Sequence, residues 1–142
     1  MKKLAKTKRN VAEMISWAVR YDRRAIWSIN ANPKSSVYGE SLKRFEGIEY
    51  RRWDPNRSKL GAGLMRTKNE KSKLLPQKGS TVLYLGAGHG TSISHLYDHL
   101  CGENNHHGGR IVAVDLASRC LRDLTHLAKT RPGLVPLSLI HI

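Results

Sequence analysis

Apolar runs of strand length alternate with helical patterns in the second half of the chain. The runs cover Thr81–Leu85, Ile111–Val114 and Leu134–Leu137. Apolar residues recur at helical spacing in the two segments between them, Thr91–Leu100 and Ala117–Lys129. Strands that alternate with helices are typical of a parallel sheet covered by crossover helices. The second half therefore predicts the order βαβαβ, which is the first half of a doubly wound α/β fold.

The first half of the chain has shorter β-prone runs joined by tight turns. The first two runs, Trp17–Arg20 and Ala25–Ile29, flank a predicted turn at Tyr21–Arg24. The next two, Ser41–Phe45 and Ile48–Trp53, are joined at Glu46-Gly47. Two such hairpins predict a small antiparallel sheet that forms a separate layer before the main fold.

The segments around these elements complete the predicted domain organisation. Val11–Trp17 is ambiguous between a short helix and the start of a strand. Asp54 can cap a helix with Pro55 at its first position, so a helix is expected over Asn56–Lys68, and Lys68–Gly79 leads into the first parallel strand. We therefore divide the chain into a basic tail (1–10), a small antiparallel β domain (11–53) and a partial α/β domain (54–142).

A glycine-rich turn follows the first predicted parallel strand, in the sequence T-V-L-Y-L-G-A-G-H-G-T. Gly86, Gly88 and Gly90 lie between this strand and a helix that begins near Thr91. Glycines there leave backbone N–H groups open to a ligand and adopt φ angles that other residues avoid, and the helix N-terminus favours an anionic group. Ordinary strand-to-helix turns also use glycines, so the turn by itself is a weak signal.

An acidic residue in the right place strengthens this interpretation. Asp115 follows the second predicted strand, where doubly wound folds place a carboxylate that binds ribose hydroxyls. The turn and the acid together indicate a nucleoside-containing cofactor. They leave open whether it is a dinucleotide or S-adenosylmethionine.

The charge of the chain favours a polyanionic partner. It has 25 Lys and Arg against 11 Asp and Glu, a formal net charge of +14, and such residues neutralise phosphates. The alternatives are a solvated basic surface and, less favoured, an anionic membrane.

The chain carries no signal for a membrane or for secretion. No apolar run approaches 18 residues, the basic start lacks a secretory signal, and Cys101 and Cys120 are interpreted as free thiols. These features favour a cytosolic location, or a nuclear one in a eukaryote.

Three arginines are candidates for guiding a phosphate backbone: Arg51, Arg52 and Arg57 flank Trp53. A charged sheet edge is an equally good explanation for them. His95, His99 and Cys101 could suggest a zinc site, but no complete set of four ligands is evident, so no metal is expected.

Several motifs together resemble one family. The chain from about Ser36 to Leu137 resembles fibrillarin, the RNA 2′-O-methyltransferase of box C/D guide ribonucleoproteins. Because it lacks a Gly/Arg-rich amino-terminal tail, it is more similar to the archaeal members of this family than to the eukaryotic ones. The resemblance rests on these motifs, in this order: S-V-Y-G-E, I-E-Y-R-R-W-D-P-N-R-S-K-L, V-L-Y-L-G-A-G-H-G-T-S-I-S-H, V-A-V-D and R-D-L-T-H-L-A-K-T-R-P-G-L-V-P.

The resemblance implies a cofactor and a set of site residues. S-adenosylmethionine would lie against the glycine turn, with Asp115 on its ribose and Leu116 beside it. The turn residues that would contact it are Gly86, Ala87, Gly88, Gly90, Thr91 and Ser92. Asp115 stands where the family usually has Glu, and His89 and Ser92 also depart from the usual residues.

The resemblance also implies a catalytic residue and partners. Lys59 matches a lysine of the family's catalytic Lys-Asp-Lys-His group, and a solvated helix lysine is the less favoured alternative. The partners would be a box C/D guide RNA with its target RNA, a Nop-domain scaffold protein and a kink-turn-binding protein of ribosomal type, with no membrane. The location would be cytoplasmic for an archaeal member and nucleolar for a eukaryotic one.

The other three catalytic residues lie, in the family, beyond the third strand, and the last residues here, S-L-I-H-I, do not follow the family pattern. We therefore expect a truncated chain without methyl transfer by itself. A non-catalytic module that binds RNA or scaffold is the alternative, and an unrelated methyltransferase or dehydrogenase is a third possibility.

Overall fold

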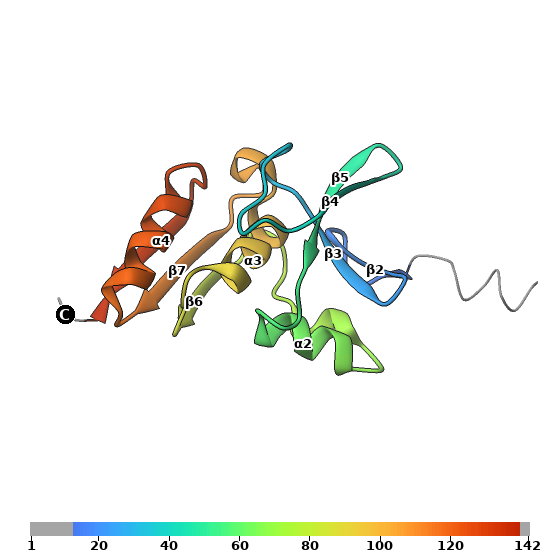
Figure 1. Ribbon diagram of the computed structural model, residues 1–142, viewed down its shortest axis with the longest axis horizontal. Helices are drawn as coiled ribbons and strands as arrows, with labels where there is room; N and C mark the ends of the chain where they lie inside the picture. Colours follow the sequence, from blue (N-terminus) through green and yellow to red (C-terminus); the bar gives the residue numbers. More distant parts are fainter. Residues whose placement is uncertain (1–12, 140–142) are drawn as a thin grey trace, which may run out of the picture.

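The computed structural model describes residues 13–139. The predicted basic tail over residues 1–10 lies outside this range. The described chain contains an antiparallel sheet followed by a parallel sheet with helices (Figure 1), which confirms the predicted fold class. None of the helices between residues 13 and 139 is long and apolar enough to span a membrane.

The first sheet is antiparallel, with strand order β1-β2-β3-β5-β4. Its strands are β1 (Glu13–Met14), β2 (Val19–Asp22), β3 (Ala25–Ile29), β4 (Leu42–Phe45) and β5 (Ile48–Trp53). Both predicted hairpins are present, and the ambiguous segment at Val11–Trp17 contributes the short strand β1.

The first hairpin is shifted from its predicted position. Tyr21 and Asp22 were expected in the turn, but they pair with Ile26 and Ala25 in the sheet. The turn consists of Arg23 and Arg24, whose φ angles are 48° and 64°, as in the two-residue turns that match the twist of a hairpin. The strand therefore begins at Val19 rather than Trp17.

The helix after the first sheet is shorter than predicted. Helix α2 covers Lys59–Arg66, and its N-cap is Ser58 rather than Asp54. The Asp54 carboxylate accepts a hydrogen bond from the Asn56 N–H instead, which stabilises a turn before the helix. A 3₁₀ turn, η1 (Lys71–Leu74), lies between α2 and the second sheet.

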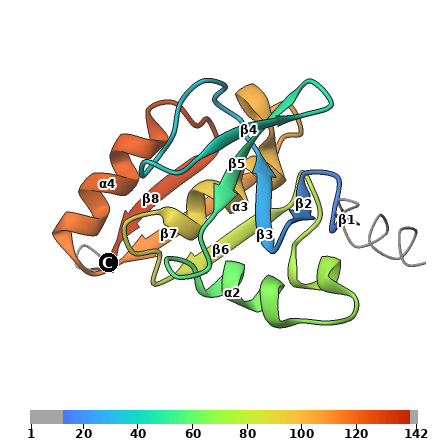
Figure 2. The ribbon, with the colours of Figure 1, turned by 45° about the vertical axis from the view of Figure 1, so that its right-hand side comes forward.

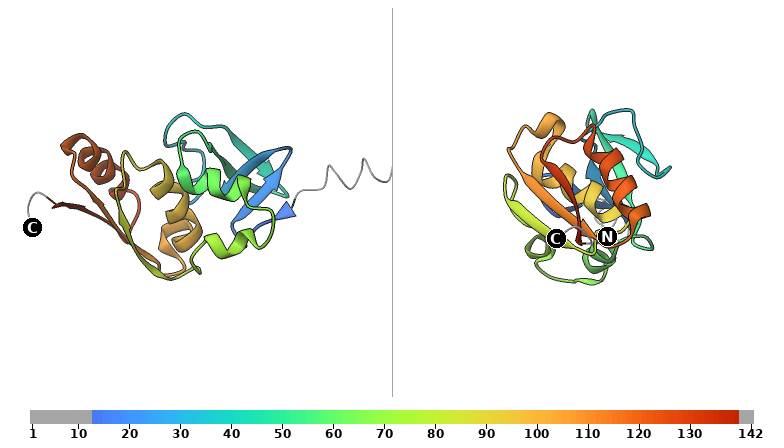
Figure 3. Two further views of the ribbon diagram at one scale, coloured as in Figure 1. Left: turned by 90° about the horizontal axis from the view of Figure 1, so that it is seen from below. Right: turned by 90° about the vertical axis from the view of Figure 1, so that its left-hand side faces the viewer.

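The second sheet is parallel, with strand order β6-β7-β8. The strands are β6 (Thr81–Leu85), β7 (Arg110–Asp115) and β8 (Leu134–Ser138), and the connecting helices are α3 (Thr91–Cys101) and α4 (Ser118–Ala128), with a short 3₁₀ turn, η2 (Glu103–Asn105), after α3. Because the strands follow one another in a single direction, right-handed crossovers place both helices on the same face (Figure 3). The other face is bare of helices within residues 13–139, and on it Leu83 and Leu85 are 63% and 67% exposed.

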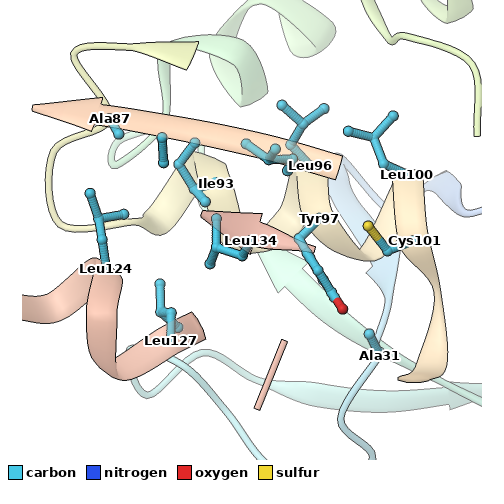
Figure 4. Packing of buried hydrophobic residues seen from close by; sticks show 12 residues of the cluster. Ala31, Ala87, Ile93, Leu96, Tyr97, Leu100, Cys101, Leu124, Leu127 and Leu134 are labelled. Atoms are coloured by element: carbon cyan, nitrogen blue, oxygen red, sulfur yellow. The ribbon is translucent and has the colours of Figure 1, made fainter. Parts of the chain in front are cut away.

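Helix α3 lies between the two sheets (Figure 2) and contacts both β3 and β7. Its residues from Ser92 to Cys101 are all buried. Figure 4 shows the main core, in which Ile93, Leu96 and Leu100 of α3 pack with Leu124 of α4. The apolar side of α3 thus packs on the parallel sheet, whereas polar side chains such as His95 and Asp98 join α3 to Ser28 and Arg51 of the first sheet.

Candidate functional site

The glycine turn forms an open cradle at the carboxyl end of β6. Gly86, Gly88 and Gly90 have φ angles of 75°, 61° and 97°, in the left-handed region that glycine adopts most cheaply. A Cβ atom at Gly86 or Gly88 would meet nothing within 4 Å. The turn is tied to β7, because the N–H groups of Gly86 and Ala87 both donate to the Val114 carbonyl, at 2.8 and 2.9 Å.

The third glycine of the turn has a different reason to be glycine. A Cβ atom at Gly90 would lie 2.4 Å from Cδ1 of Leu127 on α4. At this position a side chain would have to displace the end of the Leu127 side chain, so packing against the helix and not space for a ligand favours glycine, together with its left-handed φ. The sequence could not separate these two roles.

Asp115 lies at the end of β7, beside the cradle. Its Oδ2 accepts a hydrogen bond from the Gly88 N–H at 2.8 Å and its Oδ1 one from the Ala117 N–H at 2.9 Å. These backbone bonds, from Ala117 and then Gly88, hold the pKa of Asp115 below its usual range. The group is therefore ionised at neutral pH, and a carboxylate retains further acceptor sites for hydroxyl donors. Leu116, 61% exposed, lies next to it.

The amino-terminal end of α3 faces the same turn. Gly90 is its N-cap and has no side chain to accept from the first-turn N–H groups, so those of Thr91 and Ser92 are donors for an anionic ligand. The Ser92 hydroxyl does not point to such a ligand. It is buried and hydrogen-bonded to the Ser58 hydroxyl at 2.6 Å.

This bond brings the start of α2 to the start of α3. Lys59, the first residue of α2, is exposed and directly follows Ser58. The predicted catalytic lysine and the glycine turn, about 30 residues apart in sequence, thus belong to one region of the surface. A primary amine near the cradle can stabilise a developing oxyanion.

A histidine and two α4 side chains border the cradle. His89 Nδ1 lies 2.6 Å from Asp123 Oδ2, and its Nε2 lies 3.7 Å from the thiol of Cys120. Burial raises the pKa of the Cys120 thiol. Cys101, the other cysteine, is buried in the core, and both are free thiols, as predicted.

The structure does not support Arg51 as an RNA contact. Its side chain is fully buried, it donates from Nε to Asp98 Oδ2 at 3.0 Å, and it forms an ion pair with Glu40. Burial lowers the pKa of Arg51, but Asp98 and Glu40 outweigh this effect and raise it. Arg51 therefore joins the first sheet to α3. Alternate residues of a strand face opposite sides, so Arg52 points outward.

Arg52 and Arg57 remain available to a ligand. Both are exposed, and they line a hollow of about 210 Å³ together with Tyr38 and the carboxylates of Glu40 and Asp54. Glu40 is already paired with Arg51, and Arg57 Nε lies 3.9 Å from Asp54 Oδ2. The Arg57 guanidinium lies 5.4 Å from the centre of the Tyr38 ring. A phosphate that binds the two guanidinium groups would therefore compete with Asp54 for Arg57.

The histidines of α3 have structural partners. His95 Nδ1 bonds to the Ser28 hydroxyl and Nε2 to the Tyr38 hydroxyl, both at 2.7 Å, and its ring stacks on Trp53. His99 Nε2 donates to the Pro76 carbonyl at 2.8 Å. Among residues 13–139 no group of three His, Cys, Asp or Glu could hold a metal ion.

Ser58, Glu40 and Tyr38 were missed as parts of this region. The available signal was the pair of motifs S-V-Y-G-E and W-D-P-N-R-S-K-L, in which they stand. Their role depends on contacts with α3, which the pattern of a single chain does not reveal.

Comparison with known proteins identifies the family. The model of the family described as Fibrillarin matches residues 6–139. A protein of Methanosarcina acetivorans named fibrillarin-like rRNA/tRNA 2'-O-methyltransferase is 42% identical over 116 residues, which cover 82% of this chain and 47% of that protein.

Two solved structures are similar as well. Aeropyrum pernix fibrillarin in complex with natively bound S-adenosyl-L-methionine matches with a TM-score of 0.70 at 35% identity, over 84% of this chain and 50% of that one. A fibrillarin/Nop5p complex matches with a TM-score of 0.59 at 34% identity, over 80% and 46%. The chain spans about half the length of the relatives that it matches, and it belongs to the fibrillarin family.

Proposed function

We propose that this chain binds S-adenosylmethionine and contributes Lys59 to the 2′-O-methylation of ribose in rRNA or tRNA. The observation that carries the proposal is the open cradle at Gly86 and Gly88, with the ionised Asp115 on one side and the start of α2 on the other. The relative with natively bound S-adenosyl-L-methionine supports this choice of cofactor.

The residues of the cradle fit each part of this cofactor. Asp115 would accept from the ribose hydroxyls, and the exposed Leu116 would contact the adenosine part. The free first-turn N–H groups of α3 would bind the methionine carboxylate. The N–H groups of Gly86, Ala87 and Gly88 already donate to Val114 and Asp115, so these residues would contribute close approach of the backbone to the cofactor instead. The cofactor would supply an electrophilic methyl group.

Lys59 would act on the other reactant. Its ammonium group would lie near the ribose 2′-oxygen and stabilise the negative charge that develops there as the proton leaves. Arg52 and Arg57 would bind phosphates of the RNA and position the ribose. Base pairing with a guide RNA would then select the target sequence, so the chain would need only to contact the RNA backbone.

The partners would be those of a box C/D ribonucleoprotein: a guide RNA with its target RNA, a Nop-domain scaffold protein and a kink-turn-binding protein. The similarity to a fibrillarin/Nop5p complex supports the scaffold. The excess of 25 basic over 11 acidic residues supports the RNA.

Isothermal titration calorimetry tests the cofactor. S-adenosylmethionine should bind and NAD should not. Asp115→Ala should weaken binding about tenfold or more, because a hydrogen bond to a charged group contributes about 1.5–3 kcal/mol. Glu103→Ala, an exposed carboxylate in η2, is the matched control. Retained RNA affinity without cofactor binding would instead favour a non-catalytic RNA-binding module, and preferential NAD binding would favour a dehydrogenase.

A second experiment tests the role of the two exposed arginines in RNA binding. In Arg52→Ala/Arg57→Ala the slope of log K against log salt for single-stranded RNA should decrease by about 1.4, because each phosphate that is neutralised on a single strand contributes about 0.7 to this slope. An unchanged slope would contradict their role.

A further inference from the structure

The Ser58 hydroxyl is the centre of a buried chain of hydrogen bonds. It accepts from the Gly61 N–H at 3.0 Å and from Nε1 of Trp53 at 2.9 Å. A hydroxyl has two acceptor sites and one proton. Since both acceptor sites are used, the Ser58 proton is donated to the Ser92 hydroxyl at 2.6 Å. The polarity of the chain is thus fixed from Trp53 through Ser58 to Ser92.

The packing around this chain leaves little room for adjustment. Trp53 is fully buried, Ser58 is 4% exposed and Ser92 is 9% exposed. A Cβ atom at Gly61 would lie 2.8 Å from Nε1 of Trp53, so glycine allows the indole to reach the first turn of α2. The indole also stacks on His95 of α3, with ring centroids 4.8 Å apart. The start of α2 is therefore attached to α3 at two points.

The two ends of the chain lie in different parts of the proposed site. Ser92 is in the first turn of α3, directly after the glycine turn, and Ser58 is both the N-cap of α2 and the neighbour of Lys59. A ligand on the first-turn N–H groups of α3 polarises the hydroxyl beside them, and hydrogen bonds in a chain polarise one another.

We propose that Ser58 is a positioning residue that couples the cofactor turn to Lys59 through Ser92. This inference rests on the proposed function and assigns to Ser58 a role beyond capping α2. A displacement of about 1 Å in a reacting group can change a rate by about 100-fold. A rigid link between the cofactor and Lys59 would therefore hold the two reacting groups in register.

Nuclear magnetic resonance on the ¹⁵N-labelled chain tests the coupling. The chain has 3 tryptophans, whose indole N–H signals are assigned with Trp17→Phe and Trp27→Phe. On titration with S-adenosylmethionine the Trp53 indole signal should shift along a saturable curve, with the same Kd as calorimetry gives. The Trp27 signal, which belongs to a strand residue packed against Phe45, should not shift.

Variants separate coupling from folding. In Ser58→Ala the Trp53 shift at saturating cofactor should be lost, and in Ser92→Ala, which leaves the cap of α2 intact, it should be lost as well. Ser92→Thr retains a hydroxyl and should retain the shift. Cofactor binding without a Trp53 shift in the natural chain, or a shift that persists in Ser92→Ala, would overturn this inference alone. Absence of any cofactor-induced heat or shift would overturn the proposed function together with it.

Discussion

The molecule has two clusters of charged and imidazole side chains, and they differ in what surrounds them. At the sheet-to-helix interface, Arg51, Asp98 and His95 are buried and paired with one another or with neighbouring strands. At the carboxyl edge of the parallel sheet, His89 and Asp123 are more than half exposed. The same residue types thus stabilise a layer interface in one place and border an open cradle in the other. The two roles are therefore distinguished by how deeply each side chain is buried and by which groups it pairs with, and not by residue type.

The largest expected effect on stability comes from removing the guanidinium group at the centre of the buried cluster. Arg51→Ala should lower the free energy of unfolding by about 3–5 kcal/mol, because it leaves the carboxylates of Asp98 and Glu40 buried without their guanidinium partner. Urea denaturation measures this. Arg52→Ala, its exposed neighbour, is the matched control and should change stability by about 0.5 kcal/mol or less. Equal effects of the two variants would remove the distinction between the clusters.

Acid should also act on the buried cluster. Burial, and then the charges of Arg51 and Arg131, hold the pKa of His95 well below 6.5, and burial lowers the pKa of His99. A depressed histidine pKa means that the unfolded chain binds the proton first. Stability should therefore be complete above about pH 6.5 and should decrease as the pH falls below it, by up to about 1.4 kcal/mol per pH unit for each histidine.

Urea denaturation at pH 7.5, 6.5 and 5.5 measures this dependence. His95→Gln should reduce this dependence to the share that His99 contributes, even though the variant loses stability at every pH. A profile that keeps its full slope in His95→Gln would assign the effect to other groups.

Two glycines of the cradle should respond differently to a side chain. Gly90→Ala should cost about 1–3 kcal/mol from overpacking against Leu127, in addition to strain at its φ of 97°. Gly86→Ala meets open space and should cost only about 1–2 kcal/mol of backbone strain, while it obstructs the proposed cofactor. Thermal unfolding and calorimetry together should show the larger stability loss in Gly90→Ala and the larger relative loss of affinity in Gly86→Ala.

The smallest effect on stability is expected on the bare face of the parallel sheet. Leu85→Lys should change the free energy of unfolding by about 0.5 kcal/mol or less, because the side chain is 67% exposed. It should nevertheless reduce binding of a hydrophobic dye and self-association at high concentration, since exposed apolar patches promote both. Leu96→Lys on buried α3 is the contrasting variant and should prevent folding. A large stability loss in Leu85→Lys would show that this face is covered.

The sequence predicted the elements with strong local signals. Strand β6 was predicted with its observed bounds, and both helices of the parallel half were predicted to within a few residues, because apolar periodicity and glycine punctuation define them. The cap of α2 was misplaced because Asp54 and Ser58 are both good N-caps and only the turn at Asp54 decides between them.

The role of Arg51 could not be predicted for a different reason. Its partner Asp98 lies 47 residues away, on a helix whose contact with the first sheet is a tertiary feature. The glycine turn and Asp115, in contrast, were recognisable because neighbouring elements of one βαβ unit bring them together. Local sequence thus predicts the cradle, whereas long-range pairing decides which charges around it are free.

The Arg51–Asp98 pair also has a consequence for synthesis on the ribosome. Chains grow at about 5–20 residues per second, so the 47 residues between the two partners take roughly 2–9 s to add. Throughout that interval Arg51 can pair with Glu40, which precedes it in the chain, but has no carboxylate from α3. The interface between the first sheet and α3 is therefore expected to close only after α3 has emerged.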